Sequence, residues 1–280
     1  MSSRREEILK EIGITPIWRL RSTDAQRAES APVETVQSPD AEPQVTALQG
    51  SDRSVVAESA QQVSPASRRS SDEQSDRRIA IMRMDWSELK SAVAQCVACS
   101  LHAKRNKTVF GVGDENADWM FIGEGPGADE DRLGDPFVGQ AGKLLDNMLA
   151  AVKLKRGENV YIANIVKCRP PGNRNPEPDE ALKCEPFLQR QIELIKPKLI
   201  IALGRVAALN LLARDASIAG LRGKVLDYKN TPLIVTYHPA YLLRNLTDKA
   251  KAWEDLCFAV KTMESLQSGA GAPSNRRVAE

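Results

Sequence analysis

Four cysteines stand where they could hold a metal ion or a metal cluster. Cys96 and Cys99 form a Cys-x-x-Cys pair, Cys168 ends an apolar run, and Cys184 falls in the helical stretch that follows. Two close thiolates and two distant ones suit zinc or an iron–sulfur cluster, and the spacing does not choose between them. The alternative is that Cys168 and Cys184 are simply buried. Cys257 lies in an amphipathic stretch, where we expect a packed core residue.

A glycine-rich turn at residues 123–142 is the second candidate site, and it reads GEGPGADEDRLGDPFVGQAG. A phosphate loop would end in Gly-Lys-Ser/Thr, which this turn lacks, and its carboxylates would repel phosphate. Its first carboxylate, Glu124, can instead position a water molecule or accept a hydrogen bond from a neutral heterocycle. Phe137 is either a core residue or a surface on which a base stacks.

Two polar residues outside the turn complete this second set. Asn164 could read the edge of a heterocycle, because its amide offers both donors and acceptors. An asparagine in a strand is otherwise a buried hydrogen-bonding residue. His238 is one of two histidines and precedes a proline in YHPAYLLR. A lone histidine is usually structural, but this place at the end of an apolar run favours a site.

The elements that must position these residues are apolar, β-branched runs. The runs read WMFIGE, NVYIANIVKC, PKLIIALG and TPLIVTYHP. Helical stretches separate them, and these read GKLLDNMLAAVK, EALKCEPFLQRQIELIK and RVAALNLLAR. Near-continuous apolar strands that alternate with helices indicate an α/β protein whose parallel sheet is covered on both faces. Ligands bind such sheets at the carboxyl ends of the strands, where the candidate residues fall.

Composition divides the chain of 280 residues into zones. Residues 22–80 contain no aromatic side chain and cannot bury enough apolar area to offset their ordering entropy, so we predict a disordered linker. Residues 81–267 form the predicted globular domain, and 268–280 a disordered tail. The net charge of +2 predicts no partner by itself, so any nucleic-acid surface must be local.

Residues 1–21 differ from the linker. A Ser-x-x-Glu capping pattern begins a short helix whose Ile8, Leu9 and Ile12 share one face. An apolar peptide on a flexible tether is typical of a docking motif, and the alternative is a helix that packs on its own domain. The charged N-terminus lacks the apolar core of a signal peptide and no run could span a bilayer. We therefore expect a cytoplasmic protein that is a monomer and contacts no membrane.

Taken together, the motifs resemble the iron–sulfur uracil-DNA glycosylases, family 4 of that superfamily. The matching motifs run in order between Asp85 and Gln267: the Cys-x-x-Cys pair, GEGPGADED, DPFVGQAG, NIVKCRPPGNRNPEPDE, Cys184, IIALG and YHPAYLLR. The resemblance implies a three-layer α/β/α sandwich around a mostly parallel four-stranded sheet, which the disordered segment predicted from composition would precede. It also implies an enzyme that hydrolyses the N-glycosidic bond of deoxyuridine in DNA and leaves an abasic site.

The resemblance further implies a role for each candidate. A structural 4Fe–4S cluster would be held by Cys96, Cys99, Cys168 and Cys184. Gly125 would lie against the base, Phe137 would stack on the flipped uracil, and Asn164 would hydrogen-bond its edge. His238 would stabilise negative charge on the leaving uracil. Glu124 is the candidate for activating water, with a water held by the backbone as the rival.

Two segments are expected to contact DNA. The residues are Lys104, Arg105 and Lys107 after the cysteine pair, and Leu242, Leu243 and Arg244 after the histidine. The basic residues would contact the phosphate backbone, which predicts salt-sensitive affinity. By resemblance, the second segment would fill the gap that the flipped base leaves in the duplex.

The N-terminal peptide has a resemblance of its own, to that of the psi subunit of the bacterial DNA polymerase III clamp loader. The shared features are Ser3-Arg4-Arg5, Leu9, Gly13-Ile14-Thr15, Trp18 and Leu20-Arg21, with one extra residue between Thr15 and Trp18. This resemblance implies that clamp-loader subunits bind the peptide and tether the domain to the replisome.

Two other functions stay open at the level of sequence. The domain could be a DNA-binding module of a replisome adaptor, or the enzyme could act on other deaminated bases. Intact Glu124, Phe137, Asn164 and His238 favour the active enzyme over the adaptor. The size of the pocket around Gly125 decides which bases fit, and the sequence does not give it.

Overall fold

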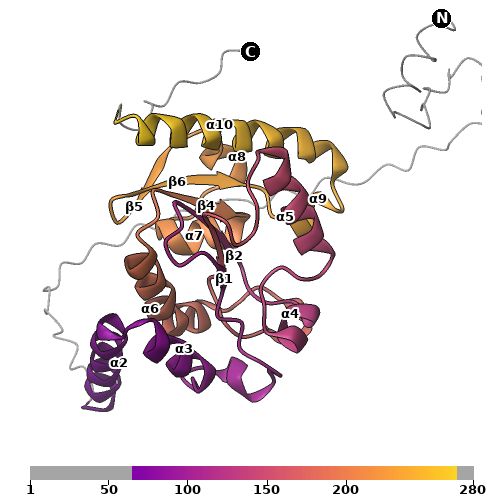
Figure 1. Ribbon diagram of the computed structural model, residues 1–280. Helices are drawn as coiled ribbons and strands as arrows, with labels where there is room; N and C mark the ends of the chain where they lie inside the picture. The colour runs from indigo at the N-terminus through magenta and orange to yellow at the C-terminus, as the bar shows by residue number, and fades with distance from the viewer. Residues whose placement is uncertain (1–64, 270–280) are drawn as a thin grey trace, which may run out of the picture. The chain divides into compact units, whose positions relative to one another are not determined.

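The structure of the protein is a computed structural model that describes residues 65–269 (Figure 1). The predicted docking peptide (1–21), most of the predicted linker and the predicted tail from residue 270 onward lie outside the described residues.

In the described residues, strands form one six-stranded sheet in the order β1-β3-β2-β4-β6-β5 (Figure 1). Their bounds are β1 Val112–Gly113, β2 Trp119–Gly123, β3 Val160–Asn164, β4 Leu199–Leu203, β5 Leu226–Tyr228 and β6 Thr231–Thr236. The central strands β3, β2, β4 and β6 pair in parallel and coincide with the four apolar runs of the sequence. The predicted α/β fold with a mostly parallel sheet is confirmed.

The sequence does not predict the two edge strands, which pair antiparallel with the parallel core. They have only 2 and 3 residues, too few for an apolar run to reveal them. Lys229 and Asn230 join β5 to β6 with φ angles of 48° and 68°. Two successive positive φ angles are typical of a tight two-residue hairpin turn.

Helices cover both faces of the sheet and give three layers. The helices are α2 Pro65–Arg83, α3 Trp86–Ala94, α4 Ala128–Leu133, α5 Gln140–Ala151, α6 Pro178–Ile195, α7 Arg205–Leu212, α8 Ile218–Leu221, α9 Pro239–Leu242 and α10 Lys249–Gln267, with 3-10 turns η1 Ser100–Ala103, η2 Pro171–Asn173 and η3 Leu246–Asp248. Met120 and Ile122 of β2 pack with α3, α6 and α7, whereas Trp119 and Phe121 pack with α5 and α10. Successive strand residues face opposite sides, so every residue of β2 is buried. Within the described ranges, no helix is both long and apolar enough to cross a bilayer.

The folded part of the chain begins earlier than the predicted domain start at residue 81, because helix α2 begins at Pro65. Its residues 65–80 belong to the segment 22–80 that composition assigns to a linker. However, Arg78 pairs with Glu185 of α6, and Ile81 at the end of the same helix is 2% exposed. Figure 1 shows α2 beside α6. Composition reports only the apolar content of a segment, so it does not reveal that charged side chains of α2 attach this helix to α6.

Candidate functional site

A pocket of about 400 Å³ opens where the parallel strands end. Six of the residues predicted to act on substrate or DNA line it together: Glu124, Gly125, Phe137, Asn164, His238 and Arg244. Residues that the sequence interpretation does not single out also line it, among them Arg174 and Tyr241.

Strand register explains why residues so far apart in sequence meet here. Gly123 of β2 pairs with Asn164 of β3, so Glu124 directly follows the glycine that faces this asparagine. Thr236 of β6 lies beside the end of β4, and His238 follows two residues later. A Cβ on Gly204 would lie 2.8 Å from the Cβ of His238, and the φ of +88° at this position also favours glycine. The IIALG motif therefore makes room for the histidine.

The carboxylates of the acidic turn have different functions in the structure. Glu130 accepts hydrogen bonds from three backbone amides and fastens the turn to the loop of Phe137. Asp131 is 1% exposed and accepts hydrogen bonds from Asn106, in the loop after the cysteine pair. The side chain of Glu124 has no hydrogen bond or ion pair within residues 65–269, and burial raises its pKa. An unpaired carboxylate with a perturbed pKa in a pocket is a candidate for chemistry.

Phe137 is held in a costly backbone conformation at the pocket wall. Its φ of +56° lies in the left-handed region, and such strain clusters at functional sites. Arg156 donates a hydrogen bond to the carbonyl of Phe137 at 2.9 Å. The phenyl ring lies 5.5 Å from the imidazole of His238, centroid to centroid. A Cβ at Gly123 would come within 2.5 Å of the ring, so the first glycine of the turn leaves space for it.

The side-chain oxygen of Asn164 accepts no hydrogen bond in the described part of the chain. The residue is 2% exposed, and this atom, Oδ1, is buried with it. A buried polar atom left unpaired costs about 1–3 kcal/mol. Because Asn164 lines the pocket, a ligand with an N–H group can remove this cost.

His238 is a neutral hydrogen-bond donor. Its Nδ1 accepts a hydrogen bond from the amide of Ala240 at 3.1 Å, so the ring proton resides on Nε2. Burial and, to a smaller extent, the charge of Arg244 lower the pKa of His238 to about 4, against the opposing charge of Glu130. The imidazole is therefore uncharged at neutral pH. Across the described residues, Nε2 donates to no protein group and is available to a ligand.

The residues after His238 form part of the pocket rim. Tyr241 is 37% exposed and stacks on Tyr237, with ring centroids 5.3 Å apart. Leu243 is exposed, as a DNA contact requires. Leu242 is 1% exposed and turns toward α5 and α10, so it is a core residue and not the DNA contact predicted. Leu242 is the last residue of the short helix α9 and Leu243 is its C-cap, so the direction in which the helix ends decides which leucine faces solvent.

The cysteines predicted to hold a metal lie together in a second, small cavity. Its walls include Cys96, Cys99, Cys168 and Cys184, whereas Cys257 is on α10. Nitrogen donors reach three of the sulfur atoms: Arg77 to Cys96 at 3.7 Å, Arg105 to Cys168 at 3.2 Å, and the amide of Lys167 to Cys184 at 3.3 Å. In residues 65–269, no three His, Cys, Asp or Glu side chains are grouped closely enough to hold a metal ion.

The surroundings of these thiols fit a cluster by residue type. Burial raises the pKa of Cys184 to about 12, although the charge of Lys167 opposes the rise. Burial also raises the pKa of Cys99 and of Cys168. Such thiols ionise when a bound metal supplies positive charge. The sulfur atoms of cysteines that hold iron–sulfur clusters typically accept hydrogen bonds from N–H groups, as three of these sulfur atoms do.

Arg105, which the sequence predicts to contact DNA, makes its side-chain hydrogen bonds at the cysteine site. Its guanidinium donates to the carbonyl of Ala94 at 3.1 Å, to the carbonyl of Cys96 at 2.7 Å and to the sulfur of Cys168. These contacts occupy both terminal nitrogens. Lys104 and Lys107 are exposed. Three neighbouring cations look alike in sequence, and the turn at η1 decides which one points inward.

Lys167 is a buried cation that sequence reasoning misses. It is 1% exposed, and its Nζ donates to the carbonyl of Asn164 at 3.1 Å and to Gln191 at 2.6 Å. Burial lowers its pKa to about 8. Since its amide also donates to the sulfur of Cys184, this one residue contacts both the pocket strand and the cysteine site.

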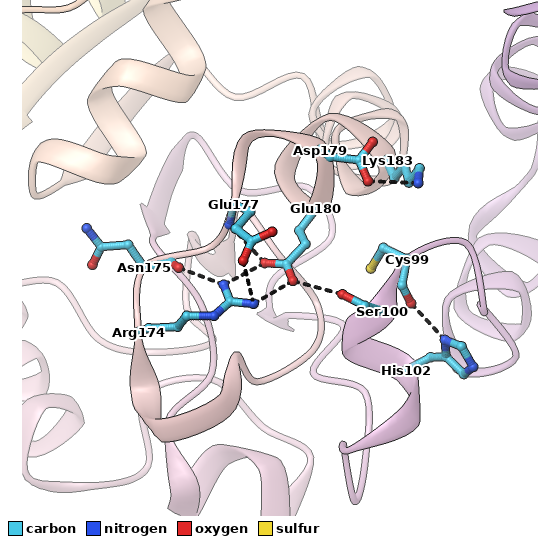
Figure 2. A network of polar contacts seen from close by, with 9 residues as sticks. All are labelled: Cys99, Ser100, His102, Arg174, Asn175, Glu177, Asp179, Glu180 and Lys183. Atoms are coloured by element: carbon cyan, nitrogen blue, oxygen red, sulfur yellow. Dashed lines mark hydrogen bonds and ion pairs between the residues drawn. The ribbon is translucent and has the colours of Figure 1, made fainter. Parts of the chain in front are cut away.

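A polar network also joins the cysteine loop to the pocket (Figure 2). Glu180, in the first turn of α6 and 2% exposed, accepts hydrogen bonds from Arg174 at 2.7 and 2.8 Å. Ser100, next to Cys99, donates to the same carboxylate at 3.0 Å. The hydrogen bonds from Arg174 lower the pKa of Glu180 to about 2, so it stays charged. Because Arg174 lines the pocket, the network fixes a pocket wall to the cysteine loop.

Replacing Glu180 by glutamine is expected to lower the free energy of unfolding by about 2 kcal/mol, the range of a hydrogen bond to a charged group. Urea denaturation at neutral pH measures this loss. Glu177→Gln is the matched control, because Glu177 also pairs with Arg174 but its side chain is 65% exposed. An exposed pair contributes little. Equal losses in the two variants would contradict a structural role for the buried carboxylate.

Comparison with known proteins gives consistent matches. A family model described as "Uracil DNA glycosylase superfamily" matches residues 110–257. Three similar proteins are each named type-4 uracil-DNA glycosylase. The protein of Archaeoglobus fulgidus is 47% identical over 159 residues, which cover 54% of this chain and 79% of the relative. The protein of Thermotoga maritima is 44% identical over 161 residues, 57% of this chain and 83% of the relative. The protein of Sulfurisphaera tokodaii is 45% identical over 166 residues, 56% and 76% respectively.

Proposed function

The chain belongs to the type-4 uracil-DNA glycosylases, and from this premise we propose how its own side chains excise uracil from DNA. The enzyme hydrolyses the N-glycosidic bond of deoxyuridine and produces free uracil and an abasic site. The observation that carries the assignment of the pocket is the unpartnered amide oxygen of Asn164, in a wall shared with Phe137 and His238. Uracil release from DNA, measured for variants of these residues, tests it.

Recognition of the base rests on Phe137 and Asn164. A base inside a duplex is out of reach, so the nucleotide must leave the stack and enter the pocket. The ring of Phe137 then provides a stacking surface. The free Oδ1 of Asn164 accepts a hydrogen bond from N3–H of uracil. Cytosine has no proton on N3, so it would leave this acceptor unpaired and oppose it with a lone pair.

Departure of the base rests on His238. When the glycosidic bond breaks, its electrons stay with uracil, and negative charge develops on N1 and O2. The Nε2–H of the neutral imidazole donates a hydrogen bond to O2, which stabilises this charge without transferring a proton. The hydrogen bond from Ala240 to Nδ1 fixes the tautomer before the substrate arrives. A donor oriented in advance contributes most when charge appears in the transition state.

Glu124 is our candidate for orienting the attacking water. If it acts as a base, its ionised form is the active one, and burial places its pKa above the ordinary value of 4.5. Activity should then fall as pH drops through this raised pKa, so the acidic limb of kcat lies above pH 4.5. We expect Glu124→Gln to remove the limb in single-turnover measurements. A limb that persists in this variant would point to water held by the backbone.

We further propose that Cys96, Cys99, Cys168 and Cys184 hold a 4Fe–4S cluster. When bound, the cluster would cross-link the Cys96–Cys99 loop to the strand end at Cys168 and to helix α6. Its function here is structural, since the cavity that the cysteines line is distinct from the pocket. The nearby Arg105 and Lys167 would offset the negative charge of the thiolates.

Replacing Cys168 by serine is expected to abolish stable iron binding and the visible absorption of the purified protein, because one of four ligands is lost. Cys257→Ser is the matched control and should keep both, since Cys257 does not line the cysteine cavity. Metal analysis and absorption spectra measure the outcome. A wild-type protein that binds zinc and no iron would contradict the cluster.

The DNA-binding face is proposed to combine exposed residues near both sites. Lys104 and Lys107 contact backbone phosphates, and Leu243 with Arg244 enters the space that the flipped nucleotide leaves. The exposure of Lys104, Lys107 and Leu243 supports this proposal, as does the place of Arg244 in the pocket lining. Phosphate contacts through lysine predict affinity that falls as salt concentration rises.

Residues 1–21 are proposed to bind clamp-loader subunits, on the resemblance to the psi peptide. They lie outside the described residues, so the proposal rests on sequence. Pull-down of clamp-loader subunits by a peptide of residues 1–21, lost on Trp18→Ala, is the expected result. Absence of binding at micromolar concentration would contradict it.

A further inference from the structure

We propose that helix α2 covers the cysteine site and that Arg77 is the positioning residue through which it acts. The inference rests on the proposed cluster for its chemistry. The family match begins at residue 110, so α2 lies outside the matched residues.

Arg77 reaches the cysteine site from α2 by three contacts. One terminal nitrogen donates to the carbonyl of Lys183 on α6 at 2.8 Å. The other points at the sulfur of Cys96, 3.7 Å away. The guanidinium also lies over the ring of Phe187, 5.0 Å from its centroid. A planar cation that stacks and donates at once is held in a single orientation.

The rest of α2 is anchored so that Arg77 stays in place. Arg78 donates to Glu185 and to Gln189, both on α6. Ile81 is 2% exposed and belongs to the main core. The neighbouring Ile79 is 48% exposed, so α2 presents one face to α6 and the other to solvent.

Beneath α2 lies a hollow of about 350 Å³ that adjoins the cysteine cavity. Its walls include Arg77, Ile81, Cys96 and Phe187, and the last two also line the cysteine cavity. Cys96 is thus the ligand on the α2 side, and it is less buried than Cys168. Cys96 is partly exposed already, and removal of the Arg77 side chain would widen the access of solvent to its sulfur through this hollow.

The chemistry gives Arg77 two effects on a bound cluster. Exclusion of water and oxidants from the Cys96 side slows loss of iron. An N–H donor to a ligand sulfur stabilises the more negative, reduced state and raises the reduction potential. Both effects act on the cysteine site, away from the pocket where uracil binds.

The test compares Arg77→Ala with Arg77→Lys and Arg83→Ala in the full chain loaded with iron. Arg83 is the matched control, because it is exposed near the end of the same helix. When a ferrous-iron chelator is added, we expect the visible absorption of Arg77→Ala to decay about tenfold faster than that of the wild type. A tenfold change in rate corresponds to the loss of about one hydrogen bond to a charged group. Its reduction potential should also shift to a more negative value. Arg77→Lys, which keeps a donor, should recover part of both effects.

Alkylation of Cys96 by iodoacetamide in metal-free protein gives a second readout, since it needs no cluster. We expect faster alkylation in Arg77→Ala than in Arg83→Ala, with equal helix content by circular dichroism. Unchanged rates of iron loss and of alkylation would overturn the inference, whereas a wild-type protein without iron would overturn the cluster alone. In that case the alkylation rates still show whether α2 shields Cys96 from solvent.

Discussion

Replacing His238 by alanine is expected to slow uracil release by about 100- to 1000-fold, the usual effect of removing one oriented donor from a transition state. Binding of uracil-containing DNA should change little, because the donor acts mainly on charge that develops as the bond breaks. Single-turnover kinetics with enzyme in excess separates the two quantities. The loss should appear in the rate constant, and the concentration dependence should stay close to that of wild type.

His102→Ala is the control for this variant, since His102 is the other histidine and is exposed. It should release uracil at the wild-type rate. His238→Gln adds information, because its amide can also donate but at a different position, and partial activity is the expected outcome. Near-full activity of His238→Ala would show that stabilisation of the leaving group does not depend on this residue.

Replacing Asn164 by aspartate is expected to reduce the preference for uracil over cytosine by about 100- to 10,000-fold. A carboxyl at a position that is 2% exposed has a raised pKa and is partly protonated. The protonated group can donate to N3 of cytosine and accept from its amino group, whereas the ionised group repels O4 of uracil. Each mismatched buried hydrogen bond costs about 1–3 kcal/mol, and two of them give this range.

Rates on duplexes that contain one uracil or one cytosine at the same position measure this preference. Asn210→Asp makes the same substitution on the exposed side of α7 and should leave the preference unchanged. A preference for uracil that survives in Asn164→Asp would contradict recognition of N3–H by the free Oδ1.

Much of the fold can be predicted because its central strands are apolar throughout. Runs such as WMFIGE and PKLIIALG match β2 and β4, since strands covered on both faces leave no polar alternation to read. The edge strands and α2 escape prediction for a different reason. The edge strands are too short for a pattern, and α2 attaches through Arg77 and Arg78, whose partners lie about a hundred residues later in the chain.

The sequence predicts the site correctly for residues that stand alone of their kind in a motif at a strand end. Asn164, Phe137 and His238 lie together as the motifs suggest. The sequence does not show which of several similar neighbours turns inward: Arg105 donates to Cys168 between two exposed lysines, and Leu242 packs in the core beside the exposed Leu243. Prediction also fails for Glu180 and Lys167, which look like surface charges until their buried partners are known.

The most direct measurement is release of free uracil by the full chain from a duplex that contains a single deoxyuridine, with enzyme in excess. The pocket geometry predicts one uracil and one abasic site for each deoxyuridine, and no release from the same duplex with cytosine at that position. A folded protein that binds the duplex but releases no uracil would contradict the account. The domain would then be a DNA-binding module of an adaptor.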